Sequence, residues 1–383
     1  MVTPRVYLDG AATQPLHPAA REALLAALDD GWADPRRLHS EGRRSRALLD
    51  GAREAIAAVL GVRTDELSFT GSHTQAVHAA VLGVAGARRR AGTTVVTSTV
   101  EHPTVLHAAD HVAARGGGAR SDVAVDRTGA VDADTFAESV NTPGVSLACL
   151  QFANAEVGTR QPLEAAATAA AAGGVPLVVD LSACAGHVDV RGARGDVLVA
   201  DPQSWGAAPG VGVLAVRAGT RWAAPGPEGD GPEAVPGGVS VPAALAAAVS
   251  LEAMVAGRAA REAEQRALVE RVRRGAAQVP DTEVLGDDVH RLPHVVTFSC
   301  LYVDGEALLS ELDRRGFAVG SGSACTASTL EPSHVLTAMG VLSHGNVRIG
   351  LTPATTGADV DAFLAVLPDA VATVRRELGV EGL

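Results

Sequence analysis

The residue most able to do chemistry in this chain is Cys325, which lies in the stretch 320–328, GSGSACTAS. Small and hydroxylic neighbours leave the thiol unshielded and the backbone free to move, so a loop here could carry a reactive sulfur atom to a partner. The alternative is a Gly/Ser-rich turn around a small buried cysteine. The other cysteines lie in apolar runs without metal-ligand spacing, and we expect them in the core: Cys149, Cys184 and Cys300.

Three polar side chains stand just beyond apolar runs that predict buried strands. They are His102 after residues 93–98, Asn154 after residues 145–150, and Asp180 at the end of residues 175–180. The last run would present a carboxylate at the carboxyl end of a parallel sheet, where ligands bind in this class of fold. The alternative for Asp180 and His102 is a helix cap or another satisfied polar position.

A further pattern suits an anion. The predicted strand 66–70 is followed by a turn of small and polar residues and by a helical run over residues 76–85. The start of such a helix presents free N–H groups and the positive end of its dipole to a phosphate. Many strand-to-helix turns look alike, so the pattern is weak by itself.

Composition limits the classes of function. The 383 residues are 47% hydrophobic and 20% charged, which predicts a folded globular protein, and the formal net charge of −12 argues against binding to a nucleic-acid backbone. No signal-like or membrane-length apolar run is found, so we expect a cytoplasmic protein that does not bind membranes. All 32 basic residues are arginine, so no side chain can form a Schiff base with a carbonyl cofactor.

The elements that must position these residues alternate between strands and helices at intervals of roughly 25 to 30 residues, which predicts a doubly wound α/β domain. A Gly/Pro-rich segment, 222–238, interrupts the alternation, and one long helix over residues 241–274 is expected to connect to a smaller lobe. We therefore predict a large α/β domain and a small α+β domain carrying the Cys325 loop. Their predicted bounds are residues 16–254 for the large domain, and residues 1–15 with 255–383 for the small one.

Together with the segment 330–339, LEPSHVLTAM, and the segment 346–350, NVRIG, the Cys325 stretch resembles the cysteine desulfurase family. These pyridoxal 5'-phosphate (PLP) enzymes move sulfur from free cysteine onto a loop cysteine as a persulfide. The resemblance runs from Tyr7 to about Leu367. It implies a type I PLP-dependent transferase fold with a mainly parallel sheet, a homodimer with active sites at the interface, L-cysteine as substrate and a sulfur-acceptor protein.

The resemblance also implies roles for individual residues. Cys325 would carry the persulfide and His102 would stack on the cofactor ring and move protons, while Asp180 would pair with the ring nitrogen. Arg348 would clamp the substrate carboxylate together with Asn154, which would also contact the cofactor. The remaining implied cofactor contacts are the phosphate-cradle residues Ser72, His73 and Thr74, the positions Gln203 and Ser204, and Ser240, which is all that is left of a cross-subunit segment.

The chain departs from the family around residues 201–204, which read DPQS where the family has SGHK. Ser204 stands in the place of the Schiff-base lysine, Gln203 in the place of a phosphate-binding histidine, and Asp201 in the place of a phosphate-binding serine. Serine can neither present PLP as an imine nor carry its proton, and an aspartate repels a phosphate.

Three functions remain open. The first is a divergent cysteine desulfurase that binds PLP without a covalent link. The second is a homologue without PLP that relays a persulfide on Cys325 or serves as the scaffold of an active desulfurase. The third is another lyase on the same fold.

Overall fold

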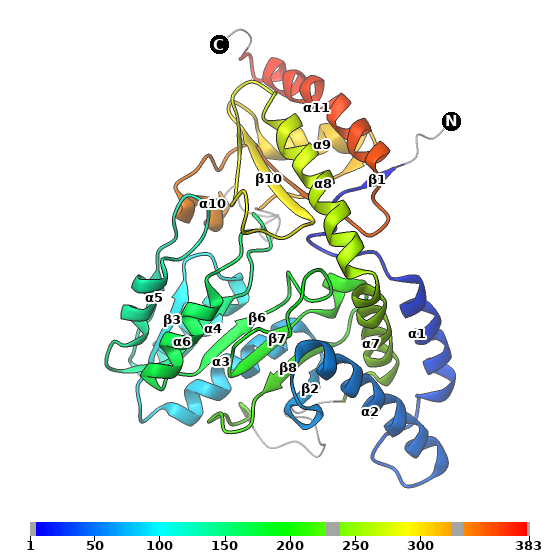
Figure 1. Cartoon of the computed structure of the whole chain (residues 1–383), viewed down its shortest axis with the longest axis vertical. Coiled ribbons are helices and arrows are strands. Elements are labelled where there is room, and N and C mark those ends of the chain that lie inside the picture. The colour runs from blue at the N-terminus through cyan, green and yellow to red at the C-terminus, as the bar shows by residue number, and fades with distance from the viewer. Residues whose placement is uncertain (1–4, 227–237, 323–331, 381–383) are drawn as a thin grey trace.

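The computed structural model describes residues 5–226, 238–322 and 332–380, and its lower half is built on a sheet with strand order β2-β8-β7-β6-β5-β3-β4 (Figure 1). Adjacent strands are parallel except around β8, which runs antiparallel to both β7 and β2. The bounds are β2 (Leu67–Thr70), β3 (Thr94–Ser98), β4 (Arg120–Val123), β5 (Val145–Gln151), β6 (Leu177–Asp180), β7 (Val197–Ala200) and β8 (Gly212–Val216). The predicted type I fold, with a mainly parallel sheet, is confirmed.

Helices cover both faces of this sheet, which is why β5, β6 and β7 are buried along their whole length. Consecutive residues point to opposite faces: Val178 packs with one layer of helices and Val179 with the other. One layer contains α3 (His73–Arg88) and α4 (Pro103–Gly116). The other contains α2 (Ser40–Leu60), α5 (Ala133–Val140), α6 (Leu163–Gly173) and α7 (Val241–Ala256), with α1 (Pro18–Asp30) packed against α7.

The upper lobe in Figure 1 has its own core, which includes Phe298, Ile349 and Phe363. Its strands form an antiparallel sheet, β12-β10-β9, and a parallel pair in which the N-terminal β1 joins β11. The strands are β1 (Val6–Tyr7), β9 (Thr282–Val284), β10 (Val295–Cys300), β11 (Phe317–Ala318) and β12 (Asn346–Gly350); the helices are α8 (Arg258–Ala276), α9 (Gly305–Arg314), α10 (His334–Met339) and α11 (Gly357–Glu377). The domain bounds given above stay a prediction.

The prediction of one long helix over residues 241–274 is wrong. Two helices, α7 and α8, meet at an angle of 73°. The break lies at Gly257, whose backbone (φ −101°, ψ 8°) leaves the helical conformation, because glycine has no side chain that favours the helix. In the described part of the chain no single helix is long and apolar enough to cross a membrane; only the bent pair α7 and α8 passes that test, by length and composition.

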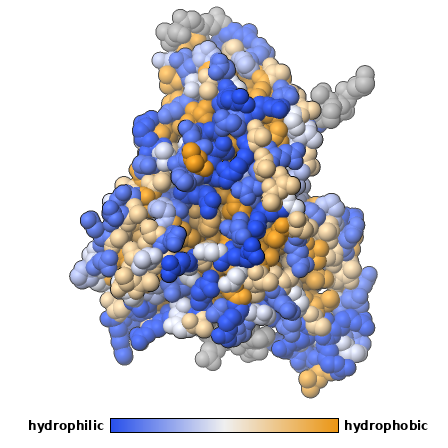
Figure 2. Space-filling model, in the orientation of Figure 1, coloured by the Kyte–Doolittle hydropathy of each residue, from blue (hydrophilic) through white to orange (hydrophobic). Residues whose placement is uncertain are grey.

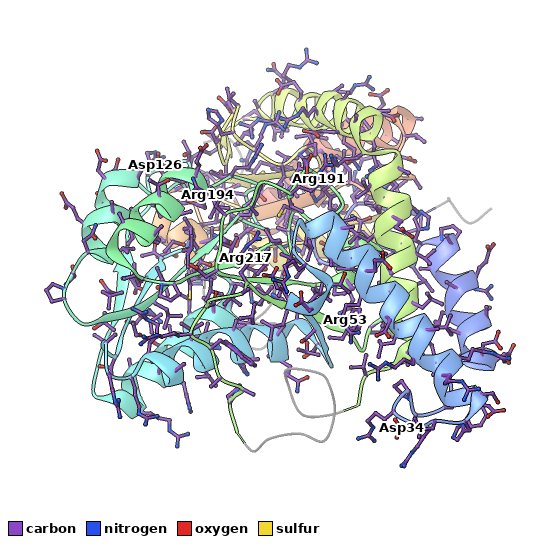
Figure 3. All side chains as sticks on the ribbon, turned by 60° about the horizontal axis from the view of Figure 1, so that its bottom comes forward. Asp34, Arg53, Asp126, Arg191, Arg194 and Arg217 are labelled. Carbon is purple, nitrogen blue, oxygen red and sulfur yellow. The ribbon has the colours of Figure 1, made fainter. Side chains whose placement is uncertain are left out.

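The amino ends of the parallel strands carry arginines. Figure 3 labels Arg191, Arg194 and Arg217 in this region. Arg217 donates to the carbonyl oxygens of Gly195, at 2.8 Å, and Gly61, at 3.3 Å, and so ties β8 to neighbouring loops. This edge therefore has a structural role, whereas His102, Asn154 and Asp180 lie at the opposite, carboxyl edge.

Candidate functional site

The carboxyl edge of the sheet gathers the predicted site residues. Asp180 ends β6 and lies opposite Gln151 of the adjacent strand β5. His102 precedes the first turn of α4, and its Nδ1 accepts the backbone N–H of Thr104 at 3.2 Å. Asn154 closes the turn after β5, where its side-chain oxygen accepts the N–H groups of Glu156 and Val157. His102 therefore also does the capping work of its alternative interpretation, and Asn154 stabilises the turn in which it lies.

The carboxylate of Asp180 is already bound by this chain's own side chains. Its Oδ1 accepts the backbone N–H of Ser182 at 2.8 Å and the Ser182 hydroxyl at 2.5 Å. Its Oδ2 lies 3.1 Å from Nε2 of His73, which begins α3. The His73 ring in turn meets the His102 ring edge to face, with centroids 5.4 Å apart.

Electrostatics favours the charged forms of His73 and Asp180, which are in contact and buried. Burial lowers the pKa of His73, but the negative charge of Asp180 and the hydrogen bond to it outweigh burial, and the net shift is upward. Burial raises the pKa of Asp180. The charge and hydrogen bond of His73, together with the hydrogen bond from Ser182, outweigh burial, and the net shift is downward. For His102, burial dominates and lowers the pKa, which favours the neutral form of its ring.

The turn over residues 201–205, where the resemblance places the family's lysine segment, is held by its own hydrogen bonds. Asp201 caps the short 3₁₀ helix η2 (Pro202–Trp205) by accepting the N–H of Gln203 at 3.0 Å. The Ser204 hydroxyl donates to the Asp201 carbonyl at 2.7 Å, and His187 donates to the Ser204 carbonyl at 2.9 Å. Burial raises the pKa of Asp201, with a smaller contribution from Asp180, while hydrogen bonding to Gln203 and the charge of His73 oppose it.

The other residues predicted to bind the cofactor have local structural partners or lie at the surface. Ser72 caps α3 by accepting the N–H of Gln75 at 3.2 Å, and Ser240 caps α7 by accepting the N–H of Ala243 at 3.3 Å. Thr74 is exposed on the first turn of α3.

A cavity of about 170 Å³ lies between the carboxyl edge and the upper lobe. Arg348 of β12 reaches it, with Nη2 3.1 Å from Asp9, while its buried Nε has no partner among the described residues. The rest of the lining comes from residues 100–103, Gln151, residues 154–156, Gly322 and residues 332–335.

Two buried glutamates in this cavity were not predicted to act. Burial raises the pKa of Glu101 to about 7 against the hydrogen bonds from Ser98 and Gln151. Burial likewise raises the pKa of Glu156 to about 7 against the hydrogen bond from Ser333 and the charge of Arg348. Each keeps one oxygen without a partner in the described chain. Segments far away in the sequence bury these two glutamates, so the residues next to them in the chain could not predict their burial.

Cys325 lies outside the described residues. The chain on either side of its loop is anchored at the cavity, since the N–H of Gly322 donates to Asn346 at 2.8 Å and the Ser333 hydroxyl donates to Glu156 at 2.8 Å. Cys149, Cys184 and Cys300 are buried, as expected.

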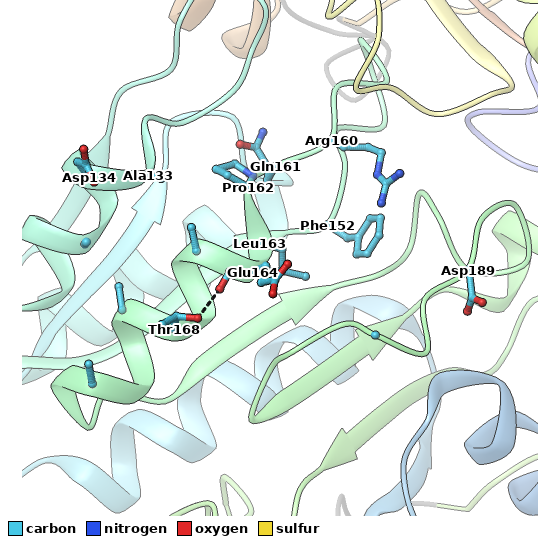
Figure 4. Close-up of a pocket in the computed structure, with 15 residues that line it drawn as sticks. Ala133, Asp134, Phe152, Arg160, Gln161, Pro162, Leu163, Glu164, Thr168 and Asp189 are labelled. Carbon is cyan, nitrogen blue, oxygen red and sulfur yellow. Dashed lines mark hydrogen bonds between the residues drawn. The ribbon is translucent and has the colours of Figure 1, made fainter.

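A larger cavity of about 870 Å³ lies along α5 and α6 (Figure 4). Alanines form much of its wall, and the guanidinium of Arg160 lies 5.0 Å from the ring centre of Phe152. None of the predicted site residues lines it, so the candidate site is the carboxyl edge with the smaller cavity.

Comparisons with known proteins agree with this geometry. Residues 6–363 match the model of the family described as aminotransferase class-V. The chain belongs to this family. A cysteine desulfurase of Cereibacter sphaeroides is 34% identical over 97% of both chains, and an IscS-like cysteine desulfurase of Mycobacterium tuberculosis is 36% identical over 97% of both chains. Among solved structures, a NifS-like protein shares the fold at a TM-score of 0.88, with 24% identity over 96% of this class-V chain and 100% of its own.

The residues of this class-V member do not fit the PLP that the resemblance implies. The ring nitrogen of PLP needs an acidic side chain to accept its proton, but Asp180 already accepts three hydrogen bonds from Ser182 and His73. Asp201 brings a carboxylate to the place implied for the phosphate, and the chain contains no lysine for an imine.

Proposed function

We propose that this protein is a sulfur-transfer member of the cysteine desulfurase family that works without PLP: it accepts a persulfide sulfur on Cys325 and passes it to an acceptor. The observation that carries the proposal is the pairing of Asp180 with His73 and Ser182 in a chain without lysine. The desulfurase relatives support the sulfur chemistry.

The transfer itself needs no cofactor. The Cys325 thiolate attacks the outer sulfur of a donor persulfide, the donor's sulfur–sulfur bond breaks, and the donor leaves as a thiolate. One sulfur–sulfur bond is broken and one is made, so there is no net oxidation. A second thiolate, on the acceptor, repeats the exchange at Cys325.

The cavity lined by Gly322 and residues 332–335 supports a small donor that carries a carboxylate. Arg348 lines this cavity, and a guanidinium pairs with a carboxylate more strongly than a neutral donor does. Glu156, with its raised pKa, adds little negative charge to oppose such an anion when it is protonated. Cysteine persulfide is a donor of this class.

The test measures transfer of labelled sulfur to Cys325. An active cysteine desulfurase is loaded with ³⁵S-cysteine in the presence of this protein, and label on Cys325 is measured by non-reducing gel and mass spectrometry. We expect label on the wild type, none on Cys325→Ser, and full labelling of Cys300→Ser as the buried-cysteine control. No label on the wild type would overturn the relay.

The second candidate is a desulfurase that binds PLP non-covalently. It is favoured by the position of His102 and Asp180 at the carboxyl edge of the sheet, where the resemblance implies ring contacts. Adding PLP and then L-cysteine to the purified protein separates the two. A cofactor absorption band that responds to cysteine, with sulfide release, would establish the desulfurase and exclude the PLP-free relay.

We further propose a cytoplasmic homodimer, with α1 and the segments on either side of it as the contact. Five large apolar side chains are exposed there, and Figure 2 shows hydrophobic surface at the lower right, where Figure 1 places α1 and α7. They are Leu16, Leu25, Leu28, Trp32 and Leu38, which we call the α1 patch. A second copy of the chain would cover it.

A further inference from the structure

We propose that the His73 ring takes the position in which the protonated nitrogen of a heteroaromatic cofactor would pair with Asp180. His73 thereby prevents such ligands from binding at this site. The inference deepens the proposed function, because it assigns the absence of cofactor binding to one side chain. It also names the ligand class that the emptied site would take: planar rings with a protonated nitrogen.

The geometry points to His73 in three ways. Its Nε2 lies 3.1 Å from Oδ2 of Asp180, the distance of a charge-assisted hydrogen bond. Both side chains are nearly fully buried, at 9% and 7% exposure, so solvent competes little for the carboxylate. His73 belongs to α3 and Asp180 to β6, so packing of the helix on the sheet holds the ring against the carboxylate.

The surroundings favour a cation at the His73 position. Asp180 and Asp201 both raise the pKa of His73, and no carboxylate other than these two contributes to its shift. Two further residues lie near His73 and Asp180. Burial lowers the pKa of His102, and the N–H and hydroxyl of Ser182 donate to Oδ1 of Asp180. A cationic ring of similar size would find the same partners if His73 were absent.

The first experiment fills the space that His73→Ala leaves. Imidazole and pyridine are added to purified H73A, and binding is measured by calorimetry and by the shift in the thermal midpoint between pH 5 and 8. We expect binding that strengthens as pH falls and the probes become cationic. The matched control is H73A/D180N, which keeps the cavity and loses the charge; its affinity for the same probes should be at least about tenfold weaker.

The second experiment asks whether His73 excludes the cofactor itself. S204K and H73A/S204K are incubated with PLP, reduced with borohydride and analysed by mass spectrometry for the adduct at residue 204. We expect the adduct in H73A/S204K, with at most about a tenth as much in S204K. The adduct readout does not depend on Cys325. A negative adduct result would therefore not contradict the sulfur relay, and a negative labelling result at Cys325 would not contradict the role of His73.

Three results would overturn the inference: equal adduct in S204K and H73A/S204K, no adduct in either while both unfold like the wild type, or probe binding to H73A that does not change when Asp180 is replaced. A direct check is available on the wild type. The His73 ring should titrate above its ordinary range by ¹⁵N NMR, and D180N should lower its pKa, since only the charge of Asp201 then opposes burial.

Discussion

Replacing Glu101 by glutamine should make this protein more stable at alkaline pH and leave its stability unchanged in acid. The Glu101 side chain is fully buried, and its Oε1 accepts the Ser98 hydroxyl at 2.6 Å and the N–H of Gln151 at 3.0 Å. Its Oε2 has no partner in the described chain. A glutamine oxygen can keep both hydrogen bonds, and the amide mimics the protonated acid in size and charge.

The magnitude follows from the shift in pKa. Burial raises the pKa of Glu101 from 4.5 to about 7 in the folded state. The folded state therefore binds more protons than the unfolded state between these values, and wild-type stability falls as pH rises through them. This difference in pKa corresponds to about 3 kcal/mol of unfolding free energy, which E101Q should regain in full above pH 8.

Urea unfolding at pH 5 to 9 measures this difference, with the fluorescence of the fully buried Trp205 as the signal. The matched control is E264Q on the exposed face of α8, where the same substitution should change the free energy of unfolding by less than about 0.5 kcal/mol at every pH. Parallel pH profiles for E101Q and the wild type, or a less stable E101Q at pH 8, would refute the reasoning.

Two further predictions concern packing and assembly. In α3, Gly83→Ala should lower the free energy of unfolding by about 1–3 kcal/mol, because its Cβ would lie 2.2 Å from the Trp222 ring. Gly86→Ala in the same helix meets nothing within 4 Å and should raise the free energy of unfolding by about 0.5–1 kcal/mol. Thermal and urea unfolding of both variants measure these changes. Replacing Leu28 and Trp32 of the α1 patch by aspartate should raise the dimer dissociation constant by at least about 30-fold in sedimentation velocity, and an unchanged dimer would show that this patch is not the interface.

The sequence alone determined much of the framework. Apolar runs that end in polar residues predicted the strands of the parallel sheet, because each run is local and its burial shows in its composition. The resemblance predicted the family, and residue counts established that no lysine is present. The break at Gly257 was missed because the apolar pattern of α7 runs up to a glycine, which permits a bend without requiring one.

Only the tertiary structure decided the state of the site. His73 and Asp180 are 107 residues apart in the chain, and the packing of α3 on the sheet brings them together. The raised pKa of Glu101 likewise depends on burial by segments distant in sequence. The sequence fixes which charges exist, but their ionisation depends on the neighbours and the solvent exclusion that folding creates, so the pairing of His73 with Asp180 became visible only in three dimensions.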